Sequence, residues 1–121
     1  MTTSAKPSSS SPKFGEEGDN AAITAFWICG IRATEHKRGD AALIKDPYAE
    51  RLMNEWAWKQ QKSLFRLRQA IIRRTLHYDG NILKAARELG CRQMIMIGAG
   101  LDTRAFRLFH DFPDMHVIEV C

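Results

Sequence analysis

A glycine loop follows a short apolar run near the end of the chain. Residues 93–97 (QMIMI) lead into Gly98-Ala99-Gly100, and an Asp-Thr pair then precedes an expected helix. Glycine permits backbone conformations that are closed to other residues, and it lets a ligand approach the main chain. The helix that follows offers unpaired N–H groups and the positive end of its dipole. This arrangement is typical of a loop that binds a nucleotide-type cofactor.

The spacing of the glycines favours one class of cofactor over another. A dinucleotide fingerprint needs a third glycine three residues after Gly100, where this chain has Thr103. S-adenosylmethionine has no pyrophosphate and does not need that glycine, but its ribose still needs a carboxylate from the end of the next strand. Glu119 lies near the spacing expected for a ribose contact, so a nicotinamide cofactor stays open as an alternative.

Asp102 stands between the loop and the expected helix, and two roles are open to it. As the residue just before a helix, it can act as an N-cap that accepts a hydrogen bond from the N–H of Arg104 or Ala105. It can also contact a ligand that is held in the loop. The capping role is the more common of the two, and the sequence leaves both open.

The composition argues against several classes of protein. With 121 residues and a formal net charge of +4, the chain is long enough for one small domain. Basic residues concentrate between 59 and 92, but no zinc, RNP-like or basic-zipper pattern accompanies them, so we expect solvated helix faces and no nucleic-acid partner.

The three scattered cysteines predict a reducing, cytoplasmic setting. No apolar stretch approaches the length of a membrane span, so no membrane partner is expected.

The apolar periodicity predicts a helical region followed by one β-α-β unit. Residues 1–18 are rich in Ser and Pro and are expected to form a disordered tail, whereas residues 19–90 are expected to be helical and residues 91–121 to begin a cofactor-binding domain. The expected helices cover 20–35, Asp46-Pro47 through Trp56, 61–74, 82–89 and 103–109. Asp79 or Asn81 is expected to cap the helix at 82–89, and Gly90 to end it. A buried parallel strand is expected at 93–97 and a second strand at 115–120.

Five segments of the chain match a known pattern in their order and spacing. They are IRATE (31–35), LIKDPYAERL (43–52), IIRRTLHYDG (71–80), RQMIMIGAGLDTRAFRL (92–108) and HVIEV (116–120). Together they resemble the S-adenosylmethionine-dependent methyltransferases of the leucine carboxyl methyltransferase family, in its broad branch of small methyltransferases. The GAGLDTRAFRL block is the most specific, and the resemblance covers roughly residues 20 to 120.

This resemblance implies an α/β, Rossmann-like class I methyltransferase fold, of which the chain carries only the N-terminal helices and the first β-α-β unit. It implies S-adenosylmethionine as the cofactor and direct methyl transfer to an oxygen of a carboxylate or hydroxyl. Arg74 matches the arginine that pairs with the methionine carboxylate of the cofactor, and Arg73 is its adjacent competitor. Gly98 and Gly100 match the loop that lies against the cofactor, and Asp102 matches an acidic residue of that loop.

The match is broken at the end of the second strand. In the family an aspartate binds the ribose two residues after the position of Glu119, and here that position is Cys121. A cysteine cannot accept hydrogen bonds from two hydroxyls as a carboxylate does, which leaves Glu119 as a partial substitute. We therefore expect a truncated product that binds S-adenosylmethionine weakly or not at all. A non-catalytic interaction module is the alternative, and the sequence does not define the methyl acceptor, a small molecule or a protein carboxylate.

Overall fold

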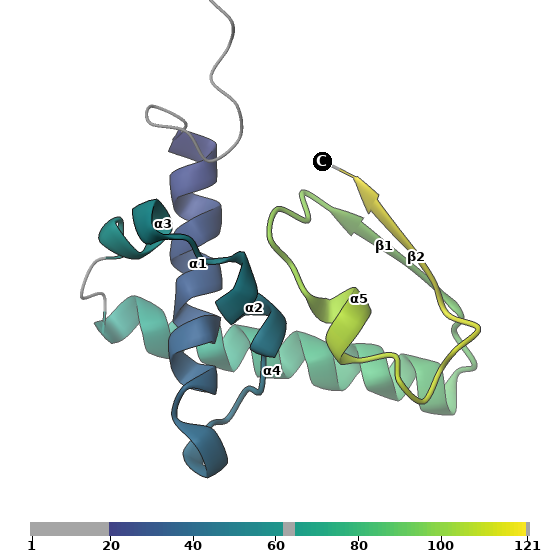
Figure 1. Ribbon diagram of the computed structural model, residues 1–121. Coiled ribbons are helices and arrows are strands. Elements are labelled where there is room, and N and C mark those ends of the chain that lie inside the picture. Colours follow the sequence, from purple (N-terminus) through teal and green to yellow (C-terminus); the bar gives the residue numbers. More distant parts are fainter. Residues whose placement is uncertain (1–19, 62–64, 121) are drawn as a thin grey trace, which may run out of the picture.

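The computed structural model describes residues 20–61 and 65–120 as a set of helices followed by two parallel strands (Figure 1). The expected tail, residues 1–18, and Cys121 lie outside the described residues. In chain order the elements are α1 (Asn20–His36), η1 (Gly39–Ala41), α2 (Pro47–Leu52), α3 (Glu55–Lys59), α4 (Phe65–Glu88), β1 (Gln93–Ile97), α5 (Arg104–Arg107) and β2 (His116–Val120). The chain is thus a mixed α/β protein in which most of the helices precede the strands.

Helix α1 is the central element of the helical part, because two apolar clusters meet on it. The Phe26 ring contacts the Trp56 ring edge-on, with their centroids 5.6 Å apart. In Figure 1, α4 crosses α1 at a steep angle and then continues toward the strands. The first cluster packs α1 against α2 and α3 through Phe26, Cys29, Ala33, Ala49, Met53 and Ala57, and the second joins α1 to α4 through Ile31, Ile44, Ile71 and Ile72.

Helix α4 is continuous over 24 residues, so the prediction of two helices, 61–74 and 82–89, was wrong. The predicted break relied on Asp79 or Asn81 as a cap, but the Asp79 carboxylate forms ion pairs with α5 instead. Gly80 has no positive φ, and it lies on the exposed side of the helix. No local conformation therefore forces an interruption, and the tertiary contacts outweigh the low helix propensity of one glycine.

The helix predicted from Asp46 through Trp56 is divided into α2 and α3. Asp46 caps α2 as predicted, since its carboxylate accepts the N–H of Ala49 at 2.9 Å. Met53 then adopts extended backbone (φ −79°, ψ 122°), and Asn54 caps α3 by accepting the N–H of Ala57 at 2.7 Å. The second cap was not recognised in the sequence because apolar residues continue on both sides of it.

Two predicted helix ends are confirmed by glycines with left-handed backbone. Gly39 (φ 63°) lies in the break after α1, and Gly90 (φ 66°) follows α4. The helix predicted over 103–109 forms only as the single turn α5, and the strand predicted over 115–120 begins one residue later as β2. A helix this short has little stability of its own, so side-chain contacts must hold it in place.

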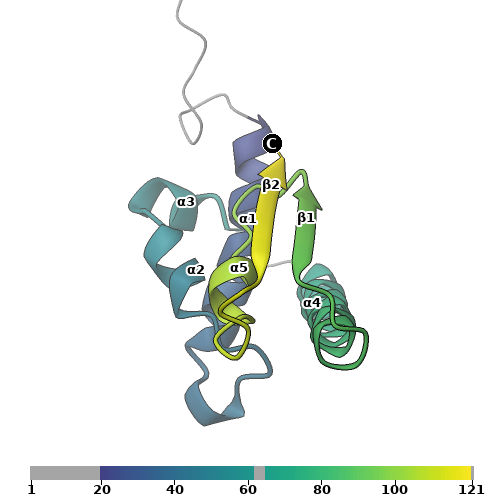
Figure 2. The ribbon, with the colours of Figure 1, turned by 90° about the vertical axis from the view of Figure 1, so that its right-hand side faces the viewer.

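The two strands pair in parallel, with Ile95 opposite Ile118 and Ile97 opposite Val120 (Figure 2). The parallel pairing agrees with the prediction, but the prediction that 93–97 is buried was wrong. Ile95 and Ile97 are 62% and 85% exposed, and Ile118 and Val120 on the same sheet face are exposed as well. Only the opposite face, which carries the methionines of β1, is partly covered by the described elements.

Candidate cofactor site

The glycine loop leaves β1 in a conformation that requires glycine at two positions. Gly98 and Gly100 have φ values of 64° and 56°. The N–H of Gly98 donates to the carbonyl of Val120 at 2.7 Å, so the loop starts where the two strands end. A Cβ at Gly98 would meet no atom within 4 Å, and at Gly100 the nearest atom would be the Ala25 Cβ at 3.7 Å. The space beside both Cα atoms is therefore open.

A cavity of about 740 Å³ lies between this loop, α1 and α4, and we call it the glycine-loop cavity. Four predicted site residues line it together, namely Arg74, Gly98, Gly100 and Asp102. A smaller cavity of about 420 Å³ adjoins it along β1 and shares Arg74, Gly98 and Asp102. The other residues that line the glycine-loop cavity are Thr24, Ala25, Ile28, Arg32, Ala99 and Leu101.

The adjacent arginines of α4 line different cavities. Arg74 belongs to the glycine-loop cavity, whereas Arg73 lines a separate cavity of about 620 Å³ between the end of α1 and the first half of α4. Arg74 is exposed, and its guanidinium has no hydrogen-bond or ion-pair partner among the described residues. Of the two arginines, Arg74 is therefore the one that is free to meet an anionic group beside the glycine loop.

The Asp102 carboxylate bonds to Arg104 at the start of α5. Its Oδ1 accepts the backbone N–H of Arg104 at 2.8 Å, and its Oδ2 pairs with the guanidinium of the same residue. The predicted capping bond to Arg104 is therefore present, while Ala105 takes no part in it. Asp102 thus fixes the end of the loop. It also lines the glycine-loop cavity, so a contact with a ligand stays a prediction.

Glu119 is not among the residues that line the cavities beside the loop. It is exposed on β2 and is paired in register with Met96. Met96 lines the smaller of these cavities. A ribose contact from Glu119 therefore stays a prediction.

A set of buried charges holds the loop against the helices, and Asp46 is its first centre. The Asp46 carboxylate is fully buried and accepts the Arg32 Nε at 3.0 Å and the Thr103 hydroxyl at 2.6 Å, besides capping α2. Arg32 also donates to the carbonyl of Leu101 at 2.5 Å. One carboxylate thereby joins α1, the start of α2 and the glycine loop.

Asp79 of α4 is the second centre. It accepts the Nε of Arg104 and the Nη1 of Arg107, each at 2.8 Å. Arg107 also donates to the Thr103 hydroxyl at 3.0 Å and lies 3.5 Å from the Asp46 carboxylate, so the two centres are connected. We call this set the loop-anchoring network; its members are Arg32, Asp46, Asp79, Asp102, Thr103, Arg104 and Arg107.

The network keeps its central carboxylate ionised. Burial acts to raise the pKa of Asp46, but hydrogen bonds from Thr103 and from the N–H that it caps, together with the charge of Arg32, hold this pKa below its usual value. The neighbouring Cys29 behaves in the opposite way, because burial raises its pKa to about 11. At neutral pH the core of the network is thus a carboxylate beside a neutral thiol.

Comparison with known proteins shows the family of this chain. The family model of leucine carboxyl methyltransferases matches residues 25–120. The chain belongs to the leucine carboxyl methyltransferase family. Relatives named as candidate S-adenosyl-L-methionine-dependent methyltransferases include one from Streptomyces coelicolor, 33% identical with 78% of this chain and 35% of the relative covered, and one from Mycobacterium marinum, 33% identical with 82% and 36% covered.

The chain spans about a third of the length of these curated relatives. No solved structure matches it significantly. Within residues 20–61 and 65–120, no three His, Cys, Asp or Glu side chains are grouped so that they could hold a metal ion. No helix in that part of the chain is both long enough and apolar enough to cross a membrane.

The segments that carry the family resemblance supply the loop-anchoring network, which sequence reasoning missed. Asp46 was recognised only as a helix cap and Asp79 only as the start of a helix. Arg32, Arg104 and Arg107 were given no role at all. Their signal was the presence of charged residues inside otherwise apolar segments, since a buried charge needs a partner. The partners lie far away in the sequence, so only the folded chain reveals the pairs.

Proposed function

We propose that this chain forms the part of an S-adenosylmethionine-dependent methyltransferase that holds the methionine end of the cofactor. The observation that carries the proposal is Arg74, whose guanidinium has no partner in residues 20–61 and 65–120 and which lines the same cavity as the two glycines of the loop. A guanidinium binds a carboxylate through two parallel N–H donors, and S-adenosylmethionine presents such a carboxylate. Gly98 and Gly100 would let the loop backbone approach the cofactor closely.

The whole protein, in this proposal, has a Rossmann-like class I fold and transfers a methyl group to an oxygen of a carboxylate or hydroxyl. When bound, S-adenosylmethionine supplies a methyl group on an activated sulfonium. Arg74 would bind and orient its methionine end, and the loop-anchoring network would hold the loop at a fixed distance from α4. Glu119 is the candidate ribose contact. A cytoplasmic location, a small-molecule or protein acceptor, and no nucleic-acid or membrane partner belong to the same proposal.

A nicotinamide dinucleotide has weaker support as the ligand. Its fingerprint needs a glycine where this chain has Thr103. Thr103 is buried, and its hydroxyl connects Asp46 to Arg107. The position therefore serves the anchoring of the loop.

Titration with S-adenosylhomocysteine, which carries the same amino-acid end, tests the proposal on the chain itself. Amide chemical shifts in an isotope-labelled sample should move at Gly98, Gly100 and Asp102. Because Arg74 would supply the main charge contact, Arg74→Ala should weaken this binding by about tenfold or more.

Arg73→Ala is the matched control, since it removes the same charge one residue away but from the other cavity. Its binding of S-adenosylhomocysteine should stay within a factor of about two of the original, as expected for a surface arginine. Equal losses of affinity in both variants would show that the effect comes from the overall positive charge of the chain. Arg74 would then not be part of the site. An absence of any saturable shift around the loop would refute cofactor binding by this chain.

The exposed sheet face favours a second candidate function, that of an interaction module. Ile95, Ile97, Ile118 and Val120 lie on one face and are all exposed, which is unusual for apolar side chains that adjoin one another. A longer relative of the same family would be the partner. Co-purification of the tagged chain with such a relative supports this function, and a chain recovered alone counts against it.

A further inference from the structure

The smaller of the two cavities beside the glycine loop has two chemically different walls. We call it the β1 cavity, and it encloses about 420 Å³ between α4 and the partly covered face of β1. Met94 and Met96 of β1 line it, and neither of them lines the glycine-loop cavity. Helix α4 contributes Arg74, Thr75 and Tyr78. The β1 cavity therefore has methionines on its strand wall and three polar side chains on its helix wall.

The spacing of these three polar residues brings them to one side of α4. Tyr78 follows Arg74 by four residues, which corresponds to a rise of about 6 Å and a rotation of about 40° around the helix. Thr75 follows Arg74 directly, on the side of the helix that packs against the rest of the protein, and it is 4% exposed. A molecule that Arg74 binds in the β1 cavity is thus within about one helical turn of two hydroxyl groups.

The Thr75 hydroxyl lacks a hydrogen-bond partner inside the protein. A threonine hydroxyl in a helix can bond to the carbonyl four residues before it, but the Thr75 hydroxyl bonds to no group in residues 20–61 and 65–120. Across those residues, the fully enclosed side-chain polar atom without a partner is His36 Nδ1 alone. The Thr75 hydroxyl is therefore not fully enclosed and opens toward the cavity that Thr75 lines. Because an unpaired hydroxyl in a nearly buried side chain is costly, a molecule in the β1 cavity can gain by bonding to it.

The Tyr78 ring is held in place by the loop-anchoring network. The Arg104 guanidinium lies over this ring, 5.8 Å from its centroid. Arg104 in turn pairs with Asp79 and Asp102. The Tyr78 hydroxyl has no partner in the described part of the chain, and a phenol hydroxyl can both donate and accept hydrogen bonds. Tyr78 thus combines a fixed ring with an unused hydroxyl at the β1 cavity.

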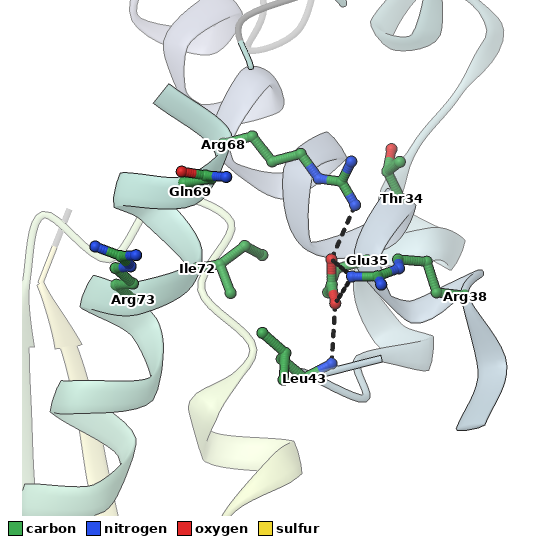
Figure 3. Close-up of a pocket in the computed structure, with 8 residues that line it drawn as sticks. All are labelled: Thr34, Glu35, Arg38, Leu43, Arg68, Gln69, Ile72 and Arg73. Carbon is green, nitrogen blue, oxygen red and sulfur yellow. Dashed lines mark hydrogen bonds and ion pairs between the residues drawn. The ribbon is translucent and has the colours of Figure 1, made fainter. Parts of the chain in front are cut away.

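The charged groups around Glu35, in the cavity on the other side of α4, satisfy one another instead (Figure 3). The Glu35 oxygens accept the Leu43 N–H at 2.9 Å, Arg38 Nη1 at 3.0 Å and Arg68 Nη2 at 2.9 Å. Arg73 extends away from this cluster in Figure 3. The unpaired groups at the β1 cavity, in contrast, share one wall.

We propose that the amino-acid end of the cofactor enters the β1 cavity, where the hydroxyls of Thr75 and Tyr78 bind it beside Arg74. This inference rests on the proposed function and adds two binding residues to it. The amino-acid end of S-adenosylmethionine carries a carboxylate and an ammonium group. Arg74 binds the carboxylate, and each hydroxyl can donate to that carboxylate or accept from the ammonium. Met94 and Met96 then border the methylene groups that lead to the sulfur.

Methionine methyl signals test which cavity the ligand enters. In a chain with isotope-labelled methionine methyl groups, titration with S-adenosylhomocysteine should shift the signals of Met94 and Met96 saturably. The signal of Met53 should stay in place, because Met53 is buried in the cluster that joins α1 to α2 and α3. Shifts at Gly98 and Gly100 without any at Met94 and Met96 would confine the ligand to the glycine-loop cavity. That result would overturn this inference and leave the proposed function intact.

Two conservative variants test the hydroxyls themselves. Tyr78→Phe keeps the ring over Arg104, and Thr75→Val keeps a branched side chain of similar size, so each variant removes little more than a hydroxyl. Each should weaken the binding of S-adenosylhomocysteine by about fivefold, as expected for the loss of one hydrogen bond. Neither should lower the denaturation midpoint, because neither hydroxyl bonds to another described residue.

Tyr48→Phe and Thr34→Val are the matched controls. The Tyr48 ring lies against Phe106, with the centroids 5.4 Å apart, and Thr34 lies at the cavity around Glu35 (Figure 3). Neither control residue lines the cavities beside the loop, so both variants should bind S-adenosylhomocysteine within a factor of about two of the original chain.

The outcomes separate this inference from the proposed function. Unchanged affinity in either Tyr78→Phe or Thr75→Val, or equal losses in the controls, would overturn the inference. The proposed function would still stand if Arg74→Ala weakened binding in the same experiment. An original chain that does not bind S-adenosylhomocysteine at all would overturn both.

Discussion

The two sides of the glycine-loop cavity use charge in different ways. On the side of the loop, the loop-anchoring network pairs each carboxylate with arginines, and Asp46 at its centre is fully buried. On the side of α4, Arg74 is exposed and has no partner among the described residues. Paired buried charges fix geometry, and an unpaired exposed charge is available for a ligand. The charged members of the loop-anchoring network therefore position the loop, and Arg74 is left available for binding beside it.

Acid should disrupt the buried paired carboxylates most strongly, namely Asp46 of the loop-anchoring network and Glu35, which pairs with Arg38 and Arg68. The pKa values of Asp46 and Glu35 are lowered in the folded chain from ordinary values of 3.8 and 4.5. A lowered folded-state pKa contributes stability that is present above the ordinary value and is lost as the pH falls through the folded-state value. The free energy of unfolding, measured with denaturant, should therefore be constant near neutral pH and fall steeply below about pH 4. A free energy of unfolding that stays level down to about pH 3 would contradict the assignment of these carboxylates.

Removing one centre of the network should have the next largest effect. Asp46→Asn keeps an oxygen for the cap of α2 but leaves Arg32, whose side chain is 6% exposed, as a buried charge without its counter-ion. We expect a loss of about 3–5 kcal/mol in the free energy of unfolding. Chemical denaturation measures it, with Asp111→Asn as the control because Asp111 is exposed. Similar small changes in both variants would show that the network does not hold the fold.

Removal of Arg74 should have the smallest effect on the fold. Since its guanidinium contacts no described partner, Arg74→Ala should change the free energy of unfolding by less than about 0.5 kcal/mol. The same denaturation experiment measures it. A large destabilisation would mean that Arg74 supports the structure, and the contrast between the two sides of the cavity would disappear.

The sequence predicted the local features well, because each depends on neighbouring residues. The glycine loop, the Asp46 cap and the Gly90 helix end all follow from the conformations that single residue types prefer. The parallel pairing of two strands followed from the apolar run and the family resemblance. The association of Arg74 with the loop came from the resemblance alone, and the structure brings both to one cavity.

The failures of prediction have a common physical cause. Asp79 resembled a helix cap, yet it pairs with residues more than twenty positions away, and α4 runs through it without a break. Ile95 and Ile97 resembled a buried strand, yet the described elements cover only the other face. In each case the residue pattern along the chain suggested one local structure. Contacts with distant parts of the chain, or the lack of them, determined the structure that formed.

The continuity of α4 fixes the positions of two of its side chains relative to each other. Arg74 faces the cavity and Asp79 holds α5, and the five residues from one to the other rise about 7.5 Å along the helix. Inserting or deleting one residue between them would rotate one relative to the other by about 100°. Either change would turn the arginine away from the loop or detach the loop from the helix. Substitutions are therefore tolerable on the exposed side of this segment, whereas changes in its length are not.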